Sequence, residues 1–281
     1  MPLTPYPQHR ILSDISNALN EDVGSGDLTA QLIPENSPAQ ATIITRQDMI
    51  LCGSPWFDTC FRTLDADCEI LWNVQEGDTV LANQTLCEVR GNARAMLTAE
   101  RTGLNFLQML SATATVTRLY VDSVKGLKAK IMDTRKTLPG LRMAQKYAVT
   151  VGGGYNQRIG LYDGILIKEN HILAAGGIRP ALQAAYSLAP KEATVQIEVE
   201  NLNELREALD AGAKLILLDN FSLSDLRAAV VMNTGYAELE ASGGVNLLTV
   251  RAIAETGVDR ISIGSLTKDV QAIDLSMRFG V

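Results

Sequence analysis

The chain has few of the residues that build soft-metal sites or disulfide frameworks. Its 281 residues include two histidines, His9 and His171, and four cysteines, all between residues 52 and 87. No two cysteines have the CxxC spacing, so a zinc site made of histidine and cysteine is not expected. The cysteines are typical of free thiols in a cytoplasmic protein, which is the location we expect. Any metal should instead be a hard cation held by oxygen atoms, such as Mg²⁺.

An excess of positive charge and long apolar runs are also missing. The formal net charge of −7 argues against nucleic-acid binding as the main role of the protein. No apolar run approaches the ~20 residues that cross a bilayer, so we expect no membrane partner. Hydrophobic residues make up 46% of the chain, which is enough for the core of one large domain or two medium ones.

The first third of the chain lacks lysine, and the first lysine is Lys125. Residues 69–90 resemble the hairpins of lipoyl and biotinyl domains, which present a modified lysine at a turn. Without a lysine, that carrier role is excluded. The apolar spacing of residues 11–23 predicts a helix, and residues 40–51 are rich in strand formers, as are residues 69–90. These segments predict a small domain that contains β structure.

Two further segments have a helical pattern. Residues 93–122 show helical apolar spacing with little punctuation, and we interpret them as one or two helices that connect the small domain to the rest of the chain. The last segment, residues 269–281, is also predicted to be helical. We expect it to pack back onto the first domain.

The second half of the chain contains six short apolar runs, most of them separated by helical patterns. This rhythm predicts repeated βα units in a parallel barrel or sheet. The carboxyl ends of such strands gather at one rim, where the chemistry of these folds takes place. The predicted strands are residues 131–133, 164–168, 195–200, 215–219, 238–242 and 260–264.

Positive charge is concentrated in residues 125–168, which contain nine Lys and Arg and two acidic residues. Arg135 and Lys136 directly follow the first predicted strand, and Lys168 ends the second. A lone buried ammonium is costly, so such a lysine needs an anionic partner or ligand. Arginine suits bidentate binding of carboxylate and phosphate, whereas lysine acts as a point charge. These three residues are therefore candidates for anion binding. The other lysines of the segment, Lys125, Lys128, Lys130 and Lys146, are expected on a solvated face.

Carboxylates end two successive strands. Glu198 and Glu200 lie on one face of their strand because side chains alternate, and Asp219 ends the next strand. Each could cap a helix or pair with a neighbouring basic residue. Their occurrence at two consecutive strand ends favours binding of a metal or of sugar hydroxyls. Together with the basic residues, they predict a phosphorylated, polyanionic substrate and a metal.

Glycine-rich turns occur at the same predicted rim. Residues 152–158 form a glycine-rich turn that ends in arginine. On its own this is a flexible connection, but beside the basic residues it suits close approach of a ligand. Residues 242–244 and 263–265 each follow a predicted strand and precede a helix. In (β/α) barrels, the loops after the last two strands often bind phosphate through backbone N–H groups.

These motifs together resemble those of the quinolinate phosphoribosyltransferases, also called carboxylating nicotinate-nucleotide pyrophosphorylases. The match runs nearly end to end, and several of its segments are long and specific. It is carried by residues 21–29, 100–105, 133–142, 168–172, 198–201, 218–220, 242–243 and 263–268.

The resemblance implies an α/β fold with an N-terminal α/β sandwich, residues 1–112, and an open, TIM-like α/β barrel, residues 113–268. It implies a homodimer in which the small domain of one subunit completes the active site of the other. The implied reaction joins quinolinate to 5-phosphoribosyl 1-pyrophosphate (PRPP) in the presence of Mg²⁺. It yields nicotinate mononucleotide, pyrophosphate and CO₂, a step of de novo NAD biosynthesis.

The resemblance also implies roles for individual residues. The expected catalytic residues are Lys136, Lys168, Glu198 and Asp219. The quinolinate carboxylates are assigned to Arg101 of the partner subunit, Arg135, Gln157, Arg158 and Lys168. Phosphate groups are assigned to Lys136 and Lys168. The ribose hydroxyls and the Mg²⁺–pyrophosphate end are assigned to Glu198 and Asp219, which would hold the metal either directly or through PRPP. The 5-phosphate is assigned to Ser242, Gly243, Gly244, Gly264 and Ser265. Thr134, Ile263 and Lys268 complete the expected substrate site.

One residue departs from the family pattern. The family usually has histidine where this chain has Gln157, which donates hydrogen bonds but carries no charge. The lost cation should weaken quinolinate binding by about 1 kcal/mol or more. The remaining cations lead us to expect that activity survives. The departure keeps open a related phosphoribosyltransferase for another aromatic acid. A barrel aldolase with a Schiff base on Lys168 and a non-catalytic ligand-binding relative are further alternatives.

Overall fold

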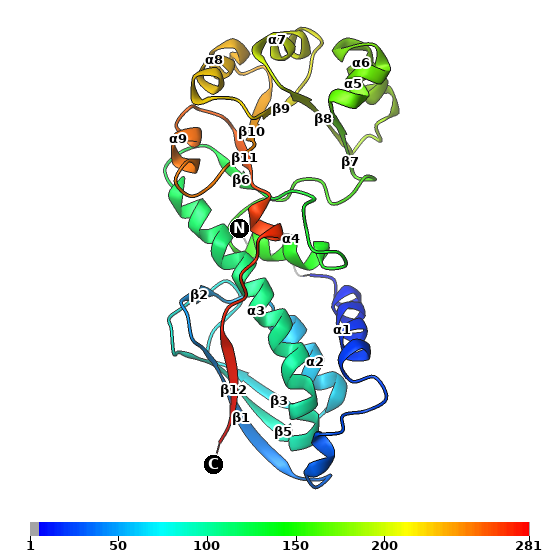
Figure 1. Cartoon of the computed structure of the whole chain (residues 1–281), viewed down its shortest axis with the longest axis vertical. Helices are drawn as coiled ribbons and strands as arrows, with labels where there is room; N and C mark the ends of the chain where they lie inside the picture. Colours follow the sequence, from blue (N-terminus) through cyan, green and yellow to red (C-terminus); the bar gives the residue numbers. More distant parts are fainter. Residues whose placement is uncertain (1–5, 281) are drawn as a thin grey trace. The chain divides into compact units, whose positions relative to one another are not determined.

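The computed structural model describes residues 6–280, which fall into two compact units (Figure 1). Unit 1 comprises Met1–Val116, Ala144–Gly153 and Asp269–Val281, and its residues 1–5 and 281 lie outside the described part. Unit 2 comprises Thr117–Met143 and Gly154–Lys268. The ends of the predicted segments 1–112 and 269–281 therefore extend beyond the described residues.

Unit 1 is built on an antiparallel sheet in the order β12-β1-β5-β3. Its strands are β1 (Pro38–Thr45), β3 (Glu69–Trp72), β5 (Thr85–Asn92) and β12 (Leu275–Phe279). A separate pair consists of β2 (Met49–Ile50) and β4 (Thr79–Val80). Alternate residues of β1 are buried toward the core, which is the pattern of a sheet covered on one face.

The helices of unit 1 pack on one another through apolar faces. Helix α1 (Gln8–Asp22) buries Ile11, Ile15 and Leu19, which recur every four residues, and it packs against α2 (Ser54–Leu64). A short 3₁₀ turn, η1 (Ala30–Leu32), follows α1. Helix α3 (Ala93–Ser123) approaches α2 closely at Gly103, where an added Cβ would lie 3.0 Å from the Phe61 ring. The helix expected over residues 11–23 is confirmed, whereas α2 was not predicted.

Residues 93–122 form one continuous helix, α3 (Ala93–Ser123), rather than two. The division between the units falls within this helix, at Val116 and Thr117. No helix among residues 6–280 has the combination of length and apolar character that would let it cross a bilayer. The four cysteines are free and buried in unit 1, as the sequence predicts.

The C-terminal segment corrects a prediction. Residues 275–279 form strand β12, so the helix expected over residues 269–281 is wrong. Strand β12 pairs antiparallel with β1, with Leu275 opposite Thr45 and Phe279 opposite Ala41. The backbone of this segment forms its ladder hydrogen bonds with β1, and this pairing stabilises the extended conformation.

Unit 2 contains a parallel sheet of six strands in the order β6-β11-β10-β9-β8-β7. The strands are β6 (Lys130–Met132), β7 (Gly164–Ile167), β8 (Thr194–Val199), β9 (Leu215–Asp219), β10 (Glu238–Ser242) and β11 (Arg260–Ser262). All six predicted strands are therefore confirmed. The sheet is open, with β6 and β7 as its edge strands, and Tyr155 adds a single parallel bridge to Met132 on β6.

Helices follow the strands of unit 2 and lie outside its curved sheet (Figure 1). They are α5 (Glu169–Ala175), α6 (Ile178–Leu188), α7 (Leu202–Asp210), α8 (Leu223–Asn233), α9 (Val250–Ala254) and α10 (Ser265–Lys268). Helix α4 (Arg142–Val151) lies between β6 and β7 in the chain, but its residues after Met143 belong to unit 1. Lys146 on α4 is buried, so its expected position on a solvated face is wrong. The central strand β9 is strongly apolar and its first four residues are buried, as expected for a parallel strand covered on both faces. The carboxyl ends of the six parallel strands meet at one edge of the sheet.

Candidate functional site

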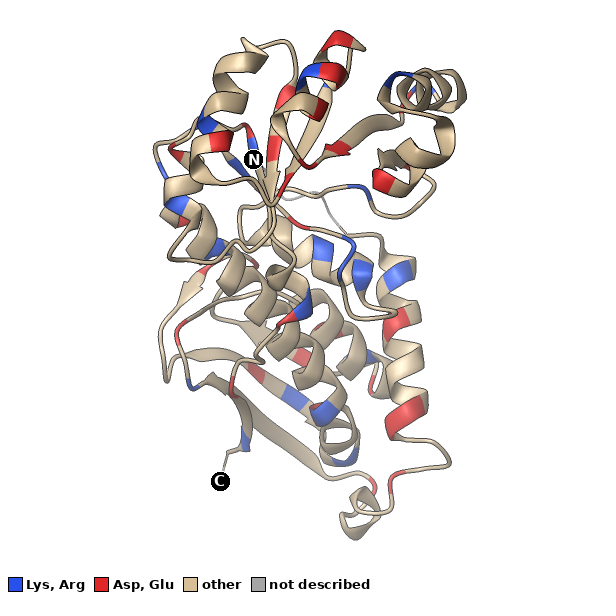
Figure 2. Ribbon diagram, turned by 45° about the horizontal axis from the view of Figure 1, so that its top comes forward, with Lys and Arg blue, Asp and Glu red and all other residues tan. Residues whose placement is uncertain are grey.

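A cavity of about 210 Å³ lies within unit 2, at the carboxyl ends of its strands. Several of its walls carry charge, and acidic residues lie on several strands of this sheet (Figure 2). The lining residues that the sequence had predicted are Thr134, Arg135, Lys136, Gln157, Arg158, Lys168, Glu198, Asp219 and Ser242. The lining residues that it had not predicted are Leu166, Gln196, Leu217, Glu240 and Ser262.

The lining follows a two-residue period along the strands. The predicted residues Lys168, Glu198, Asp219 and Ser242 form the rim of the cavity, and the residues two positions earlier on the same strands form its floor. The floor residues are Leu166, Gln196, Leu217 and Glu240, together with Ser262, which lies two positions before the bordering residue Gly264. Because side chains i and i+2 share a face of a strand, this alternation is the signal from which the floor could have been found in the sequence.

The remaining predicted residues lie outside the lining of this cavity. Gly264 borders its wall, since an added Cβ would lie 3.0 Å from Cδ of Lys136. Ile263 is buried, and its N–H donates to Met132 O at 3.0 Å. Helix α10 begins at Ser265 and ends at Lys268.

Arg101 is the predicted residue that belongs to unit 1. It lies on α3, its side chain is exposed, and it does not line the cavity. The structure of the single chain therefore leaves its expected role as a residue donated to a partner subunit as a prediction.

Two loops that carry basic residues are joined by Arg142. Its Nε donates to Thr137 Oγ1 at 3.1 Å and its Nη2 to Arg135 O at 3.4 Å, both in the loop after β6. Its Nη1 donates to Ile159 O at 3.2 Å, in the loop before β7. Arg142 does not itself line the cavity. It fixes the backbone from which the basic side chains of the cavity project.

The guanidinium groups of the cavity are partly desolvated. Arg158 Nη1 donates to Gly164 O at 3.0 Å, and burial, together with the nearby charge of Arg135, lowers the pKa of Arg158. Arg135 has a buried Nε without a hydrogen-bond partner in the described chain. Two like charges held near each other in a partly buried site favour binding of an anion, because an anion offsets the cost of both.

Lys168 and Glu198 form an ion pair across neighbouring strands. Lys168 Nζ lies 3.1 Å from Oε1 and 2.9 Å from Oε2 of Glu198, whose side chain is only 10% exposed. The Lys168 N–H donates to His171 Nδ1 at 3.0 Å, which fixes the start of α5. An ammonium paired with a carboxylate is not a free amine nucleophile, so this arrangement disfavours the aldolase alternative.

Asp219 is held by a turn that requires glycine nearby. Asn220 follows it with a φ of 55°, and its Nδ2 donates to Asp219 Oδ2 at 2.8 Å. The Asn220 N–H donates to Ser242 O at 2.9 Å. Gly243 has a φ of 103°, and an added Cβ there would lie 2.0 Å from Asn220 Oδ1. Gly243 is predicted to bind phosphate, and its missing side chain also makes room for Asn220.

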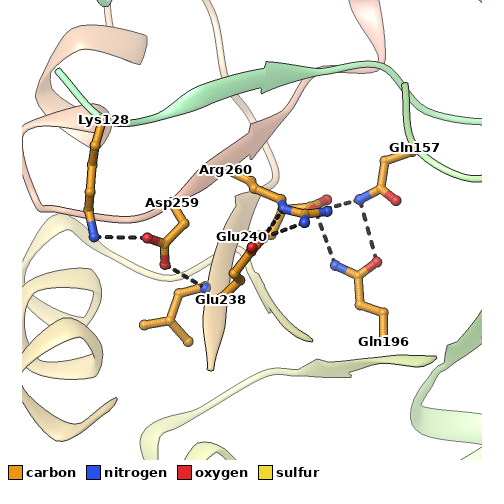
Figure 3. A network of polar contacts seen from close by, with 8 residues as sticks. Lys128, Gln157, Gln196, Glu238, Glu240, Asp259 and Arg260 are labelled. Carbon is orange, nitrogen blue, oxygen red and sulfur yellow. Dashed lines mark hydrogen bonds and ion pairs between the residues drawn. The ribbon is translucent and has the colours of Figure 1, made fainter. Parts of the chain in front are cut away.

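The floor of the cavity contains a buried acid, Glu240, on which the amide groups of Gln157 and Gln196 converge (Figure 3). Glu240 Oε2 accepts from Gln157 Nε2 and, at 3.1 Å, from Gln196 Nε2. The Gln157 backbone is fixed by its N–H bond to Asp133 Oδ1, at 2.8 Å. Burial raises the pKa of Glu240, while Gln196, Ser262, Gln157 and the charge of Arg260 oppose this effect in part.

The residues fit a magnesium ion that is shared with a substrate. No cluster of three or more His, Cys, Asp or Glu side chains that could hold a metal occurs in the part of the chain that the structure describes. Glu198 and Asp219 do supply hard oxygen donors at the rim. Mg²⁺ is commonly held by one or two carboxylates together with substrate phosphates, so two rim carboxylates are a suitable donor set.

An open parallel α/β barrel with a cation-rich cavity at its strand ends defines an enzyme class that acts on anionic substrates. More specifically, the chain belongs to the quinolinate phosphoribosyltransferase family. Residues 113–278 match the description "Quinolinate phosphoribosyl transferase, C-terminal domain", and residues 27–111 match the N-terminal domain of the same family.

Individual relatives agree with this family over most of the chain. The "Probable nicotinate-nucleotide pyrophosphorylase [carboxylating]" of Bacillus subtilis is 41% identical over 257 residues, which cover 92% of this chain and 89% of the relative. The "Nicotinate-nucleotide pyrophosphorylase [carboxylating]" of Mycobacterium leprae is 40% identical over 279 residues, or 94% and 95% of the two chains. The solved structure of the nicotinate-nucleotide pyrophosphorylase from Francisella tularensis is similar with a TM-score of 0.95 and 46% identity, and covers 99% of each chain.

Proposed function

We propose that this chain is a quinolinate phosphoribosyltransferase that converts quinolinate and PRPP to nicotinate mononucleotide, pyrophosphate and CO₂. The observation that carries the proposal is the cavity itself, in a chain that belongs to this family. It brings basic residues from three segments together with the rim carboxylates Glu198 and Asp219. A dianionic acid and a phosphorylated sugar are the kinds of substrate that such a site can bind.

The basic side chains of the cavity are proposed to bind the two carboxylates of quinolinate. Arg135, Arg158 and Lys168 line it, and each offers charged N–H donors. Gln157 adds a neutral amide where the family usually has a charged group. Binding in this pocket would hold the ring nitrogen in place for attack, and such positioning accounts for much of the rate in bimolecular reactions.

The rim is proposed to bind PRPP. Glu198 and Asp219 would accept hydrogen bonds from the ribose hydroxyls, and Lys136 would contact phosphate. The 5-phosphate is proposed to lie against the glycine-containing loops that follow β10 and β11, because backbone N–H groups of such loops can bind phosphate. The residues of these loops are Ser242, Gly243, Gly244, Ile263, Gly264, Ser265 and Lys268, and Thr134 lies beside Gly264.

The chemistry then requires no protein nucleophile. The ring nitrogen of quinolinate forms the bond to C1 of the ribose as the bond from C1 to pyrophosphate breaks. When bound through Glu198, Asp219 and the pyrophosphate, Mg²⁺ would neutralise charge on the leaving group. Lys136 and Lys168 would stabilise the same developing charge. As the 2-carboxylate leaves as CO₂, the electron pair of the broken C–C bond stays on the ring carbon, where the adjacent positively charged nitrogen stabilises it. That carbon then takes up a proton.

The chain is further proposed to act as a homodimer in the cytoplasm. Each site would be completed by Arg101 of the partner subunit, and the exposure of Arg101 supports this proposal. Four buried free thiols agree with a reducing compartment. Mixing an Arg101→Ala variant with a Lys168→Ala variant should form hybrid dimers with one intact site. Proven subunit exchange without recovered activity would contradict the shared site.

The direct test is an assay with quinolinate, PRPP and Mg²⁺ that follows nicotinate mononucleotide and CO₂ together. Equal amounts of both products are expected. Folded protein that forms product with another aromatic acid, and none with quinolinate, would assign the chain to a different substrate. Borohydride in the presence of substrate should trap no imine on Lys168, and a trapped adduct would favour the aldolase alternative.

A further inference from the structure

The buried acid at the floor of the cavity has no role in the proposed reaction. Glu240 is fully buried at 0% exposure, on β10 two residues before the rim residue Ser242. Its Oε2 accepts from two amide groups, those of Gln157 and Gln196. Gln157 Nε2 also lies 3.4 Å from Gln196 Oε1. Figure 3 shows the three side chains converging on one point.

This arrangement fixes the direction in which the Gln157 amide points. An ionised carboxylate only accepts hydrogen bonds, so each glutamine must turn an N–H toward Glu240. The carboxylates of an acid substrate also only accept. Gln157 can therefore help to bind the substrate only through N–H groups that, in this structure, face Glu240 and Gln196. A carboxylate bound near an ionised Glu240 would in addition be repelled by it.

We propose that Glu240 takes up a proton when the acid substrate binds. Protonation then causes the side-chain amide of Gln157 to rotate, so that its oxygen and its NH₂ group exchange places. The inference rests on the proposed function. The proton comes from the solvent, and no bond of the substrate changes. A protonated Glu240 donates its O–H to Gln157 Oε1, which leaves the N–H groups of Gln157 to the substrate carboxylate. Glu240 acts through Gln157 and is thus a positioning residue.

The surroundings of Glu240 favour this exchange. Its Oε1 is buried without a hydrogen-bond partner in the described chain, so an ionised Glu240 leaves a buried acceptor unsatisfied. Burial raises the pKa of Glu240, which brings protonation closer to neutral pH.

The charged groups around Glu240 determine when the proton is taken up. Arg260 on β11 lowers the pKa of Glu240. The charged side chains elsewhere in the cavity are Arg135, Lys136, Arg158, Lys168, Glu198 and Asp219. A bound dianion neutralises the cations among them, and so removes attraction that favours the ionised form of Glu240.

The test is calorimetric titration in buffers of equal pH and different ionisation enthalpy, which counts protons exchanged on binding. Quinolinate is titrated alone, and phthalate is titrated with PRPP and Mg²⁺ present. Phthalate has the two carboxylates but no ring nitrogen and cannot react. The full-length protein is expected to take up as much as one proton per site. The Glu240→Gln variant, a neutral isostere, should bind both acids at least as tightly and take up none.

A second measurement needs no variant. As the pH rises from the pKa of Glu240 in the free protein to its pKa in the complex, the affinity for either acid should fall by at most about tenfold per pH unit. The KM for quinolinate should follow this pH dependence, whereas kcat should change less. In Glu240→Gln the dependence should be flat. Glu255→Gln, which removes a surface carboxylate of the same unit with 51% exposure, should behave like the unmodified protein.

Each outcome bears on a different claim. Binding without proton uptake by the unmodified protein, or equal uptake by Glu240→Gln, would overturn this inference and leave the proposed function standing. If the folded protein binds neither acid, the proposed function fails and the inference fails with it.

Discussion

Glu76 in unit 1 and Glu240 in unit 2 are both carboxylates held among protein donors, and they differ in how many of their oxygen atoms are used. Glu76 Oε1 accepts from Gly53 N at 2.8 Å, and Oε2 accepts from Ser54 N at 3.2 Å and Ser54 Oγ at 2.6 Å. Glu240 has one oxygen bonded to two amides and one without a partner in the described chain.

The difference distinguishes a carboxylate that supports the fold from one that faces a ligand. Glu76 satisfies the backbone N–H groups at the start of α2, which would otherwise lack partners. Glu240 lies at a cavity and leaves an acceptor unused, which is costly unless a ligand or a proton compensates. We therefore expect substitutions in the two units to separate into losses of stability and losses of activity.

The largest effect should come from Lys168→Ala. The change leaves Glu198 without its partner and removes a cation from the cavity, so kcat/KM should fall by about 10²–10³-fold. Steady-state kinetics with both substrates measure it. The matched control is Lys128→Ala. The side chain of Lys128 is 58% exposed, and its Nζ forms an ion pair with Asp259 Oδ1 at 2.9 Å. That control should change kcat/KM less than about twofold. Equal losses would contradict the assignment of Lys168 to the site.

Gly243→Ala should have the next largest effect. The new Cβ would displace Asn220, whose amide holds Asp219, and a misplaced Asp219 should lower kcat/KM by about 10²-fold. Gly244→Ala is the comparison, because Gly244 also has a positive φ, of 61°, but open space around an added Cβ. If the two variants lose the same activity, backbone strain rather than the contact with Asn220 is the cause.

Glu76→Ala should change stability instead of activity. Removing a carboxylate that satisfies two backbone N–H groups should lower the free energy of unfolding by about 2–3 kcal/mol. Denaturant titration measures this loss, and kcat/KM of the folded variant should stay within about twofold. Glu69→Ala, at an exposed position of β3, should cost less than about 0.5 kcal/mol. A loss of activity without a loss of stability in Glu76→Ala would remove the contrast between the units.

The smallest effect is expected from Gln157→His. An imidazolium would add a charge to the quinolinate pocket and should lower the KM for quinolinate about three- to tenfold. Since a histidine is charged below a pKa of about 6.5, the gain should be present at pH 6 and largely lost at pH 8. An equal KM for the variant and the unmodified protein at both pH values would show that charge at this position is not used.

The six strands of unit 2 could be predicted because each apolar run ends in a polar or small residue that marks the rim. Gln196, Glu240 and Ser262 each lie two residues before such a polar or small residue. They therefore share a strand face with the rim residues, and the alternation of side chains along a strand could have predicted them. These residues were missed because they lie inside the strands, where polar side chains give no motif and the hydrogen-bond network appears only in three dimensions. The burial of Glu240 and its bond to Gln157 are visible only in the structure.

The C-terminal strand was missed for a different reason. Leu275, Met277 and Phe279 alternate with polar residues, as in a strand, but the segment is short. Its conformation is decided by pairing with β1, more than 220 residues earlier in the chain. Helix α2 was missed because its buried Trp56, Phe57 and Phe61 are equally good strand formers, so that tertiary packing decided the outcome.

The two-residue period of the cavity has a consequence for how such a protein can change. Rim and floor are successive layers on the same strands, so side chains of one layer can be replaced while the backbone that carries the other stays in register. The rim would continue to hold a phosphorylated sugar while Leu166, Gln196, Leu217, Glu240 and Ser262 are varied. A library restricted to these five positions therefore offers a route to new acid acceptors with an unaltered donor.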